Sequence, residues 1–218
     1  LGADGVGIIH GARRGTVVID MSTIDPTATR RIAQTLDDRG IDMLDAPVSG
    51  GPQGARDAAL TMMVGGPSAA LERVRPLLAL LGPTIIHLGE SGAGQTTKAC
   101  HQLALLVTAQ GVAEALTLAR RCGLDVERVR QVMMGGMASS RVLDLFGARM
   151  ASRDFSAGIE SRLYHKDLDI ALGLAHERGA ALPAAALTLQ FINGVIGRGR
   201  GRDDLSGLIT VVEEPDIS

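Results

Sequence analysis

Thr16-Val17-Val18-Ile19-Asp20, followed by a helical pattern from Asp25-Pro26 to Leu36, is the stretch that decides the fold. The first segment is a short run rich in β-branched residues, which is typical of a buried strand. The second begins with a residue that caps helices and a proline, which fits a first helical turn. A strand followed directly by a helix predicts a βα unit of an α/β sheet.

The same alternation continues to residue 91. The sequence predicts further strands at 43–46, 60–64 and 84–88, and a helix over 68–81 capped by Ser68. Parallel strands need a crossover between them, and helices of this length can supply one. Residues 1–91 are therefore expected to form an α/β domain with a partly parallel sheet.

The character of the sequence changes after Gly94. Residues 95–121 are rich in Ala and Leu with few helix breakers, which predicts one long buried helix. Shorter helical patterns follow at 125–134, 139–150, 161–178, 183–196 and near 204–212, with a Gly-Arg loop at 197–202 between the last two. We therefore expect an all-α domain over 92–218, joined to the α/β domain through the long helix.

Composition excludes several classes of protein. The chain has 218 residues, 45% of them hydrophobic, which is enough for a substantial core. A net charge of −2 and 2% aromatic residues argue against a nucleic-acid partner. No uninterrupted apolar run reaches the roughly 20 residues of a membrane-spanning helix. Cys100, Cys122 and the five histidines show no metal-ligand spacing, so we expect no metal and a reducing, cytoplasmic location.

Only two of the 22 basic residues are lysines, Lys98 and Lys166. Arginine does not release its proton in proteins, whereas an amine can act as a general base once its pKa falls. On a helix, His101 and Gln102 share the face of Lys98. These polar groups on an apolar helix need partners, either a substrate or an interdomain hydrogen-bond network. The alternative for the two lysines is chance survival in an Arg-rich composition.

A glycine-rich loop follows the strand predicted at 43–46. Ligands of open α/β sheets bind beyond the carboxyl ends of strands. Ser49, Gly50 and Gly51 can present a hydroxyl and accessible backbone N–H groups to an anion such as a carboxylate. A tight turn without a ligand is the alternative.

Taken together, these motifs resemble those of the 3-hydroxyacid dehydrogenase family. That family includes 3-hydroxyisobutyrate dehydrogenase, tartronate semialdehyde reductase and, more distantly, the 6-phosphogluconate dehydrogenases. The matching stretches occur in the family's order and cover nearly the whole chain. They are Asp20-Met21-Ser22-Thr23, Asp45 to Gly54, Met63-Val64-Gly65-Gly66, Gly92 to Gln102, Lys166-Asp167-Leu168 and Asp204-Leu205-Ser206.

The resemblance implies a fold and a role for particular residues. Residues 1–91 would be the C-terminal part of a Rossmann-like NAD(P)-binding domain. Lys98 matches the family's catalytic lysine, and Ser49, Gly50 and Gly51 match the loop that holds the substrate carboxylate. Thr23 matches a residue beside the nicotinamide, and Lys166 matches a second lysine on the cofactor side.

Two features depart from the family pattern. His101 and Gln102 stand where the hydroxyisobutyrate enzymes usually carry asparagines, so substrate contact is expected from this pair but its geometry is open. No G-x-G-x-x-G follows a strand, so the loop that binds the pyrophosphate is missing. We therefore expect roughly 70–90 further residues of the dinucleotide-binding domain before Leu1. The preference for NAD or NADP is left open.

The expected function is hydride transfer between NAD or NADP and a small 3-hydroxy acid of the hydroxyisobutyrate or tartronate semialdehyde type. Lys98 would act as general acid and base, which requires its pKa to fall from about 10.4 toward neutrality. The expected partners are a small carboxylate substrate and a second copy, in a homodimer or homotetramer formed through the helical domain. Two alternatives are a truncated, non-catalytic dimerising fragment and an imine reductase, against which Lys98 argues.

Overall fold

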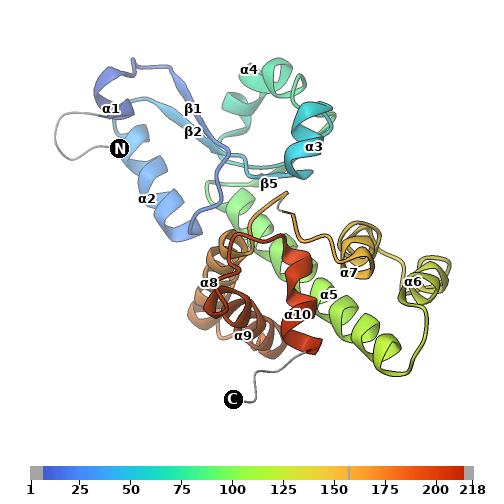
Figure 1. Ribbon diagram of the computed structural model, residues 1–218. Coiled ribbons are helices and arrows are strands. Elements are labelled where there is room, and N and C mark those ends of the chain that lie inside the picture. Colours follow the sequence, from blue (N-terminus) through green and yellow to red (C-terminus); the bar gives the residue numbers. More distant parts are fainter. Residues whose placement is uncertain (1–6, 157, 214–218) are drawn as a thin grey trace. The chain divides into compact units, whose positions relative to one another are not determined.

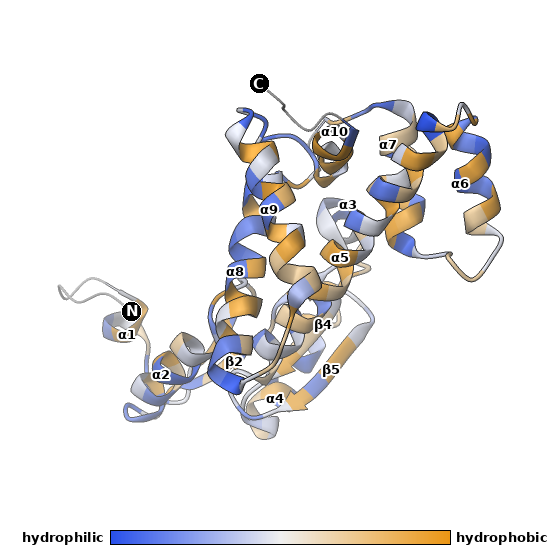
Figure 2. Cartoon of the chain, turned by 90° about the horizontal axis from the view of Figure 1, so that it is seen from below, coloured by the Kyte–Doolittle hydropathy of each residue, from blue (hydrophilic) through white to orange (hydrophobic). Residues whose placement is uncertain are grey.

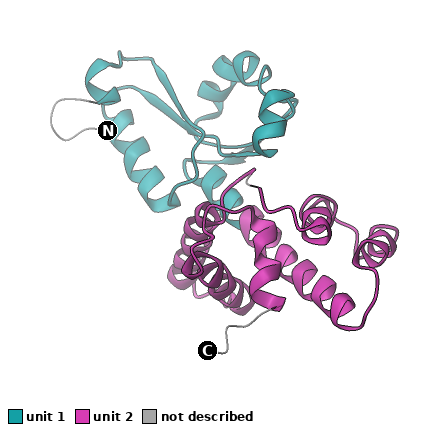
Figure 3. Ribbon diagram, in the orientation of Figure 1, with its two compact units in different colours: residues 1–100 teal, residues 101–218 magenta. Residues whose placement is uncertain are grey.

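A computed structural model describes residues 7–156 and 158–213 (Figure 1). The chain divides into two compact units, Leu1–Cys100 and His101–Ser218 (Figure 3). Helix α5 (Ala93–Arg121) begins in the first unit and continues into the second. The domain boundary expected after residue 91 stays a prediction, and each unit is described by itself below.

Unit 1 is built on a five-stranded sheet. Its strands lie in the order β1-β2-β4-β3, and β5 also pairs with β4, from Thr61 to Gly65. β1 is parallel to β2 and β4 is parallel to β5, whereas β4 runs antiparallel to β2 and β3. The expected α/β fold with a partly parallel sheet is confirmed. The strands are β1 (Val17–Asp20), β2 (Asp42–Asp45), β3 (Val48–Ser49), β4 (Thr61–Gly65) and β5 (Thr84–Gly89).

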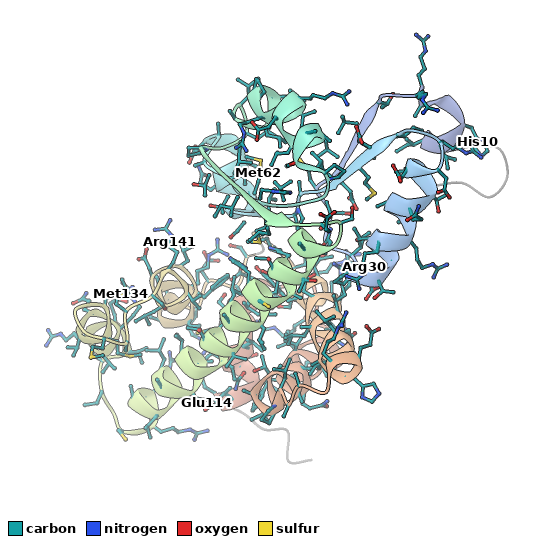
Figure 4. All side chains as sticks on the ribbon, turned by 180° about the vertical axis from the view of Figure 1, so that it is seen from behind. His10, Arg30, Met62, Glu114, Met134 and Arg141 are labelled. Atoms are coloured by element: carbon teal, nitrogen blue, oxygen red, sulfur yellow. The ribbon has the colours of Figure 1, made fainter. Side chains whose placement is uncertain are left out.

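Helices cover both faces of this sheet because side chains alternate along its strands. Leu44 of β2 packs in one apolar cluster with α4 (Ser68–Leu78) and with Met62, which is fully buried and labelled in Figure 4. Met43, the preceding residue of β2, packs in another cluster with α2 (Pro26–Asp37) and α1 (Ile8–Gly11). Adjacent residues of β2 therefore pack into the apolar layers on opposite faces of the sheet.

The structure corrects three expectations about unit 1. The helix expected over 68–81 ends at Leu78, and Pro67 rather than Ser68 is its N-cap, because Pro67 has extended backbone angles. The loop after β2 also contains more regular structure than the sequence predicts. It forms the short strand β3 and the helix α3 (Gly51–Arg56), whose two glycines and one proline are poor helix formers.

The described residues of unit 2 form helices joined by loops, with no strand, which confirms the expected all-α region. One expectation needs refinement, because the helix predicted over 139–150 contains a π-helical segment, Leu143–Gly147. The other elements follow the predicted ranges closely. They are α6 (Val126–Met134), α7 (Ala148–Ser152), α8 (Ser161–Arg178), α9 (Pro183–Gly197), the 3-10 turn η2 (Leu205–Gly207) and α10 (Leu208–Glu213).

The core of unit 2 is formed around the second part of α5. Leu106, Leu116 and Ile192 are among its fully buried side chains, and apolar residues recur along α5 and α9 (Figure 2). At 29 residues, α5 is long and apolar enough to cross a membrane, so the expectation that no segment reaches this length is wrong. Half of its most apolar stretch is buried inside the protein.

Candidate functional site

Lys98 lies in the second turn of α5 and is almost completely buried. Its side chain is 8% exposed, and its Nζ donates a hydrogen bond to the main-chain oxygen of Val48 at 2.8 Å. Val48 belongs to β3 and immediately precedes the loop formed by Ser49, Gly50 and Gly51. The amine and the predicted carboxylate-binding loop are therefore brought together within unit 1.

The loop itself has the backbone conformation that its glycines permit. Gly50 and Gly51 have φ angles of 136° and 64°, a region that residues with a Cβ rarely adopt. Ser49 is half-buried beside them at the end of β3. Successive residues in such conformations can turn their main-chain N–H groups toward one point, as the binding of an anion requires.

A buried carboxylate holds the start of α5. Asp45, the last residue of β2, is fully buried, and its Oδ1 and Oδ2 accept hydrogen bonds from the N–H groups of Gly92 and Gln95 at 2.8 and 2.9 Å. The first N–H groups of a helix have no acceptor within the helix, so a side chain commonly supplies one. Here the cap comes from a strand 47 to 50 positions earlier in the chain.

Two glycines allow this close approach. A Cβ on Gly94 would lie 2.3 Å from the carbonyl oxygen of Met63 and 2.6 Å from that of Asp45. A Cβ on Gly65 would lie 2.6 Å from Oδ1 of Asp45. Real Cβ atoms are not found at such distances, so the start of α5 packs against β2 and β4 only because both positions lack a side chain.

Gln95 connects α5 to the segment that follows β1. Its Nε2 donates to the carbonyl oxygen of Ser22 at 2.8 Å, and its Oε1 accepts from the N–H of Ile24 at 3.2 Å. Thr23 lies between these two residues, and Ser22 is further held by Asp20, whose Oδ1 accepts from the Ser22 N–H at 3.0 Å. Gln95 is 1% exposed, so this amide fixes Thr23 from the interior of unit 1.

A second polar group lies in unit 2. The Nε2 of Gln102 donates to Oδ2 of Asp167 at 2.5 Å, and its Oε1 lies 3.0 Å from Nδ1 of His101. The other oxygen of Asp167 accepts from Nζ of Lys166 at 2.8 Å. His101, Gln102 and Lys166 are thus brought together within unit 2, and Asp167 is the residue that joins them.

Tyr164 is one turn of α8 before Asp167 and does not compete as an acid or base. Burial raises the pKa of its hydroxyl far above the ordinary value, and the carboxylates of Asp204 and Asp167 raise it further. The phenol therefore keeps its proton at every physiological pH. Among the described residues, no group of three or more His, Cys, Asp or Glu side chains is arranged to hold a metal ion.

Sequence reasoning misses three residues that organise these groups: Asp45, Gln95 and Asp167. Each lies inside one of the stretches that resemble the family, but its residue type alone indicates no role. The available signal was a charged or amide side chain in an otherwise buried segment, since such groups are hydrogen-bonded when buried. Asp45 and Gln95 bond to residues 47 to 73 positions away, and Gln102, which bonds to Asp167, is 65 positions away from it, so the sequence alone does not identify these contacts.

The burial of Asp45 leads to a testable pH dependence. Burial raises the pKa of this carboxyl above its ordinary 3.8, although the backbone N–H groups of Gly92 and Gln95 lower it. A raised folded-state pKa stabilises the protein below the unfolded pKa, and this contribution is lost as pH rises through the folded-state value. We expect the stability of the parent relative to Asp45→Asn to fall as pH rises from about 4 toward neutrality.

Urea unfolding of both proteins across that range measures the difference. A difference that stays constant, or grows with pH, contradicts the assignment of a raised pKa to Asp45.

Models of two protein families match the chain. The model described as the NAD-binding domain of 6-phosphogluconate dehydrogenase matches residues 3–89. The model described as the NAD-binding part of NADP-dependent 3-hydroxyisobutyrate dehydrogenase matches residues 92–212. Together they cover the sheet of unit 1, all of α5 and the helices of unit 2 up to residue 212.

Individual relatives agree with these models. The 2-hydroxy-3-oxopropionate reductase of Escherichia coli K12 is 42% identical over 207 residues, which are 95% of this chain and 71% of the relative. The solved 3-hydroxyisobutyrate dehydrogenase of Salmonella typhimurium is 29% identical with a TM-score of 0.88, over 94% of this chain and 72% of that one. The 3-hydroxyisobutyrate dehydrogenase of Mycobacterium tuberculosis, solved with L-serine, is 32% identical with a TM-score of 0.86. The match covers 94% of this chain and 73% of that one.

An α/β sheet of Rossmann type that leads through one long helix into a helical unit defines an NAD(P)-binding oxidoreductase. More narrowly, the chain belongs to the 3-hydroxyisobutyrate dehydrogenase and 6-phosphogluconate dehydrogenase family of NAD(P)-dependent 3-hydroxyacid dehydrogenases. The family and fold expected from the sequence are confirmed.

Proposed function

We propose that the chain oxidises and reduces a small 3-hydroxy acid with NAD or NADP, and that Lys98 is the general acid and base. The observation that carries this proposal is the buried Nζ of Lys98, bonded to Val48 beside the Ser49-Gly50-Gly51 loop. The bond to the Val48 oxygen holds this compact amine beside the loop proposed to bind the substrate carboxylate.

In the direction of oxidation, the neutral amine of Lys98 accepts the proton of the substrate hydroxyl. In the direction of reduction, its ammonium donates that proton to the carbonyl oxygen. The carbonyl oxygen of Val48 keeps Nζ in one direction, so the proton is exchanged at a fixed point.

Ser49, Gly50 and Gly51 are proposed to hold the carboxylate of the substrate. The positive φ angles of both glycines and the absence of side chains support contact by main-chain N–H groups. His101 is proposed to contact the substrate as well. Gln102 is 4% exposed and has both ends of its amide within bonding distance of protein groups, so we expect it to act on the substrate through His101.

The residues of unit 1 also fit a nicotinamide cofactor, which accepts or donates the hydride when bound. Thr23 follows the carboxyl end of β1, the end at which α/β sheets bind nucleotides, and Gln95 fixes its segment. Thr23 is proposed to contact the cofactor there. Lys166, with its side chain 50% exposed and paired with Asp167, is proposed to contact the cofactor from unit 2.

The identity of 42% to a 2-hydroxy-3-oxopropionate reductase points to substrates with three carbons. We expect the intact gene product to reduce 2-hydroxy-3-oxopropionate and to oxidise glycerate with a higher kcat/KM than 3-hydroxyisobutyrate, L-serine or succinic semialdehyde. Assays of all five with NAD(H) and NADP(H), followed at 340 nm, measure this order. A protein that binds cofactor but turns over none of the five contradicts the proposed function.

A non-catalytic dimerising fragment is the second candidate, because no G-x-G-x-x-G follows a strand in the 218 residues. Titration of NADH and NADPH against the protein distinguishes the two. Saturable binding of either cofactor favours the enzyme, whereas dimers without cofactor binding favour the fragment. Light scattering of the same samples tests the homodimer or homotetramer proposed through the helical unit.

A further inference from the structure

We infer that Asp45 and Gln95 are positioning residues, which set the places of Lys98 and Thr23 from the first turn of α5. Neither touches the reacting atoms. The inference rests on the function proposed above for Lys98 and Thr23, and it adds the connection between them. All four residues lie in unit 1.

Asp45 and Lys98 both link the start of α5 to the segment that runs from the end of β2 to β3. The carboxylate of Asp45 binds the first turn of α5 through Gly92 and Gln95. Three residues further along both segments, Nζ of Lys98 binds the carbonyl oxygen of Val48. A change in the first contact therefore shifts Lys98 relative to Val48 and to the loop that begins at Ser49. Displacements of about 1 Å in a reacting group lower rates by roughly 100-fold.

Gln95 extends the connection to the other proposed contact. Its N–H is bonded to Asp45, and its side-chain amide is bonded to the residues on both sides of Thr23. The main chain and the side chain of one residue thus link β2, α5 and the segment after β1. Loss of the amide alone leaves the bond to Asp45 intact and releases only the Thr23 segment.

The packing gives this arrangement little freedom to adjust. Asp45 is fully buried and Gln95 is 1% exposed, and Gly65 and Gly94 leave no space for even one added carbon beside the carboxylate. The hydrogen bonds of a close-packed, buried group have well-defined geometry because neighbouring atoms restrict its rotamers. Such a group fits a positioning role better than a flexible surface cap does.

Two variants separate the two links. In Asp45→Asn, the amide oxygen still accepts one N–H. The amide NH2 is a donor and cannot accept the other N–H, so the first turn of α5 shifts. We expect kcat to fall about 10- to 100-fold while the Kd of the cofactor changes less than about twofold. In Gln95→Leu, we expect the Kd of the cofactor to rise about tenfold with a smaller change in kcat, because two hydrogen bonds to the Thr23 segment are lost.

The control for loss of a helix cap is Asp125→Ala. Asp125 caps α6 in unit 2 by accepting from the N–H of Arg128 at 3.1 Å, so this variant removes a helix cap away from Lys98 and Thr23. We expect it to lower Tm and to leave kcat and the cofactor Kd as in the parent. Unchanged kcat and Kd in folded Asp45→Asn and Gln95→Leu, with a lower Tm alone, overturn the inference.

A second readout does not depend on turnover. The 218-residue chain contains only two lysines, so labelling lysine with 13C at Cε gives two resonances, which Lys98→Arg and Lys166→Arg assign. We expect Asp45→Asn to shift the resonance of Lys98 and to leave that of Lys166 unchanged. An unshifted Lys98 resonance in the folded variant overturns the positioning role.

The two readouts also distinguish the two possible failures. If Lys98→Arg keeps full activity, the proposed function fails, and the shift of the Lys98 resonance still decides whether Asp45 positions it. If Asp45→Asn does not fold, Gln95→Leu keeps the inference falsifiable, because it removes no buried charge and its cofactor Kd is measured in the same way.

Discussion

Replacement of Lys98 by arginine is expected to lower kcat by about 10²- to 10⁴-fold, the usual contribution of a positioned general acid or base. Arginine keeps the positive charge and can donate to the Val48 oxygen, but its guanidinium does not release a proton. The loss therefore falls on proton transfer. The measurement is steady-state turnover of 2-hydroxy-3-oxopropionate by the intact gene product, with circular dichroism to verify the fold.

Lys166→Arg is the matched control, because it changes the other lysine in the same way. Lys166 is half exposed and pairs with Asp167 through its charge, which arginine retains. We expect its kcat to stay within about tenfold of the parent, since arginine keeps the positive charge both for the pair with Asp167 and for the proposed cofactor contact. Equal losses in both variants would show that the effect is not specific to the amine of Lys98.

Replacement of Gly94 by alanine is expected to have the largest effect on stability. Its Cβ would lie 2.3 Å from the Met63 oxygen, and backbone on both sides prevents an easy adjustment. We expect a loss of about 3 kcal/mol, at the upper end for overpacking, and a decrease in Tm of roughly 6–12 °C for a chain of this size. Thermal unfolding followed by circular dichroism measures it.

Gly111→Ala provides the opposite result in the same helix. Gly111 also lies in α5, but an added Cβ there meets nothing within 4 Å. Alanine in an open helical position is expected to stabilise by about 0.5–1 kcal/mol. If Gly94→Ala and Gly111→Ala change Tm in the same direction, the close packing of α5 against β2 and β4 is wrong.

Local patterns were sufficient to predict most elements of the fold. The β-branched run at 16–20 and the Asp25-Pro26 start predicted β1 and α2, and Asp25 does cap that helix by accepting from Ala28 at 2.7 Å. Local sequence patterns did not predict the elements that tertiary contacts stabilise against the intrinsic propensity of their residues. β3 has two residues and exists because it pairs with β4 at Val48 and Met62. Such a pairing leaves no periodic pattern in the sequence.

The candidate site was predictable only in part. Lys98, Ser49 and the two glycines could be identified from the sequence, because a rare residue type marks the first and a glycine-rich loop marks the others. Asp45 and Gln95 were not, because their importance depends on partners that folding brings near. Gln102 shows the same limit, since its position beside His101 was clear but its bond to Asp167 spans 65 residues.

The most direct test of Lys98 as general acid and base is a single-turnover measurement with enzyme in excess over substrate. It compares the parent with Lys98→Arg after cofactor and substrate have bound, so that binding and product release do not contribute. The account predicts similar Kd values for both ligands and a transfer step slower by at least about 100-fold in the variant. A transfer rate within about tenfold of the parent would contradict it.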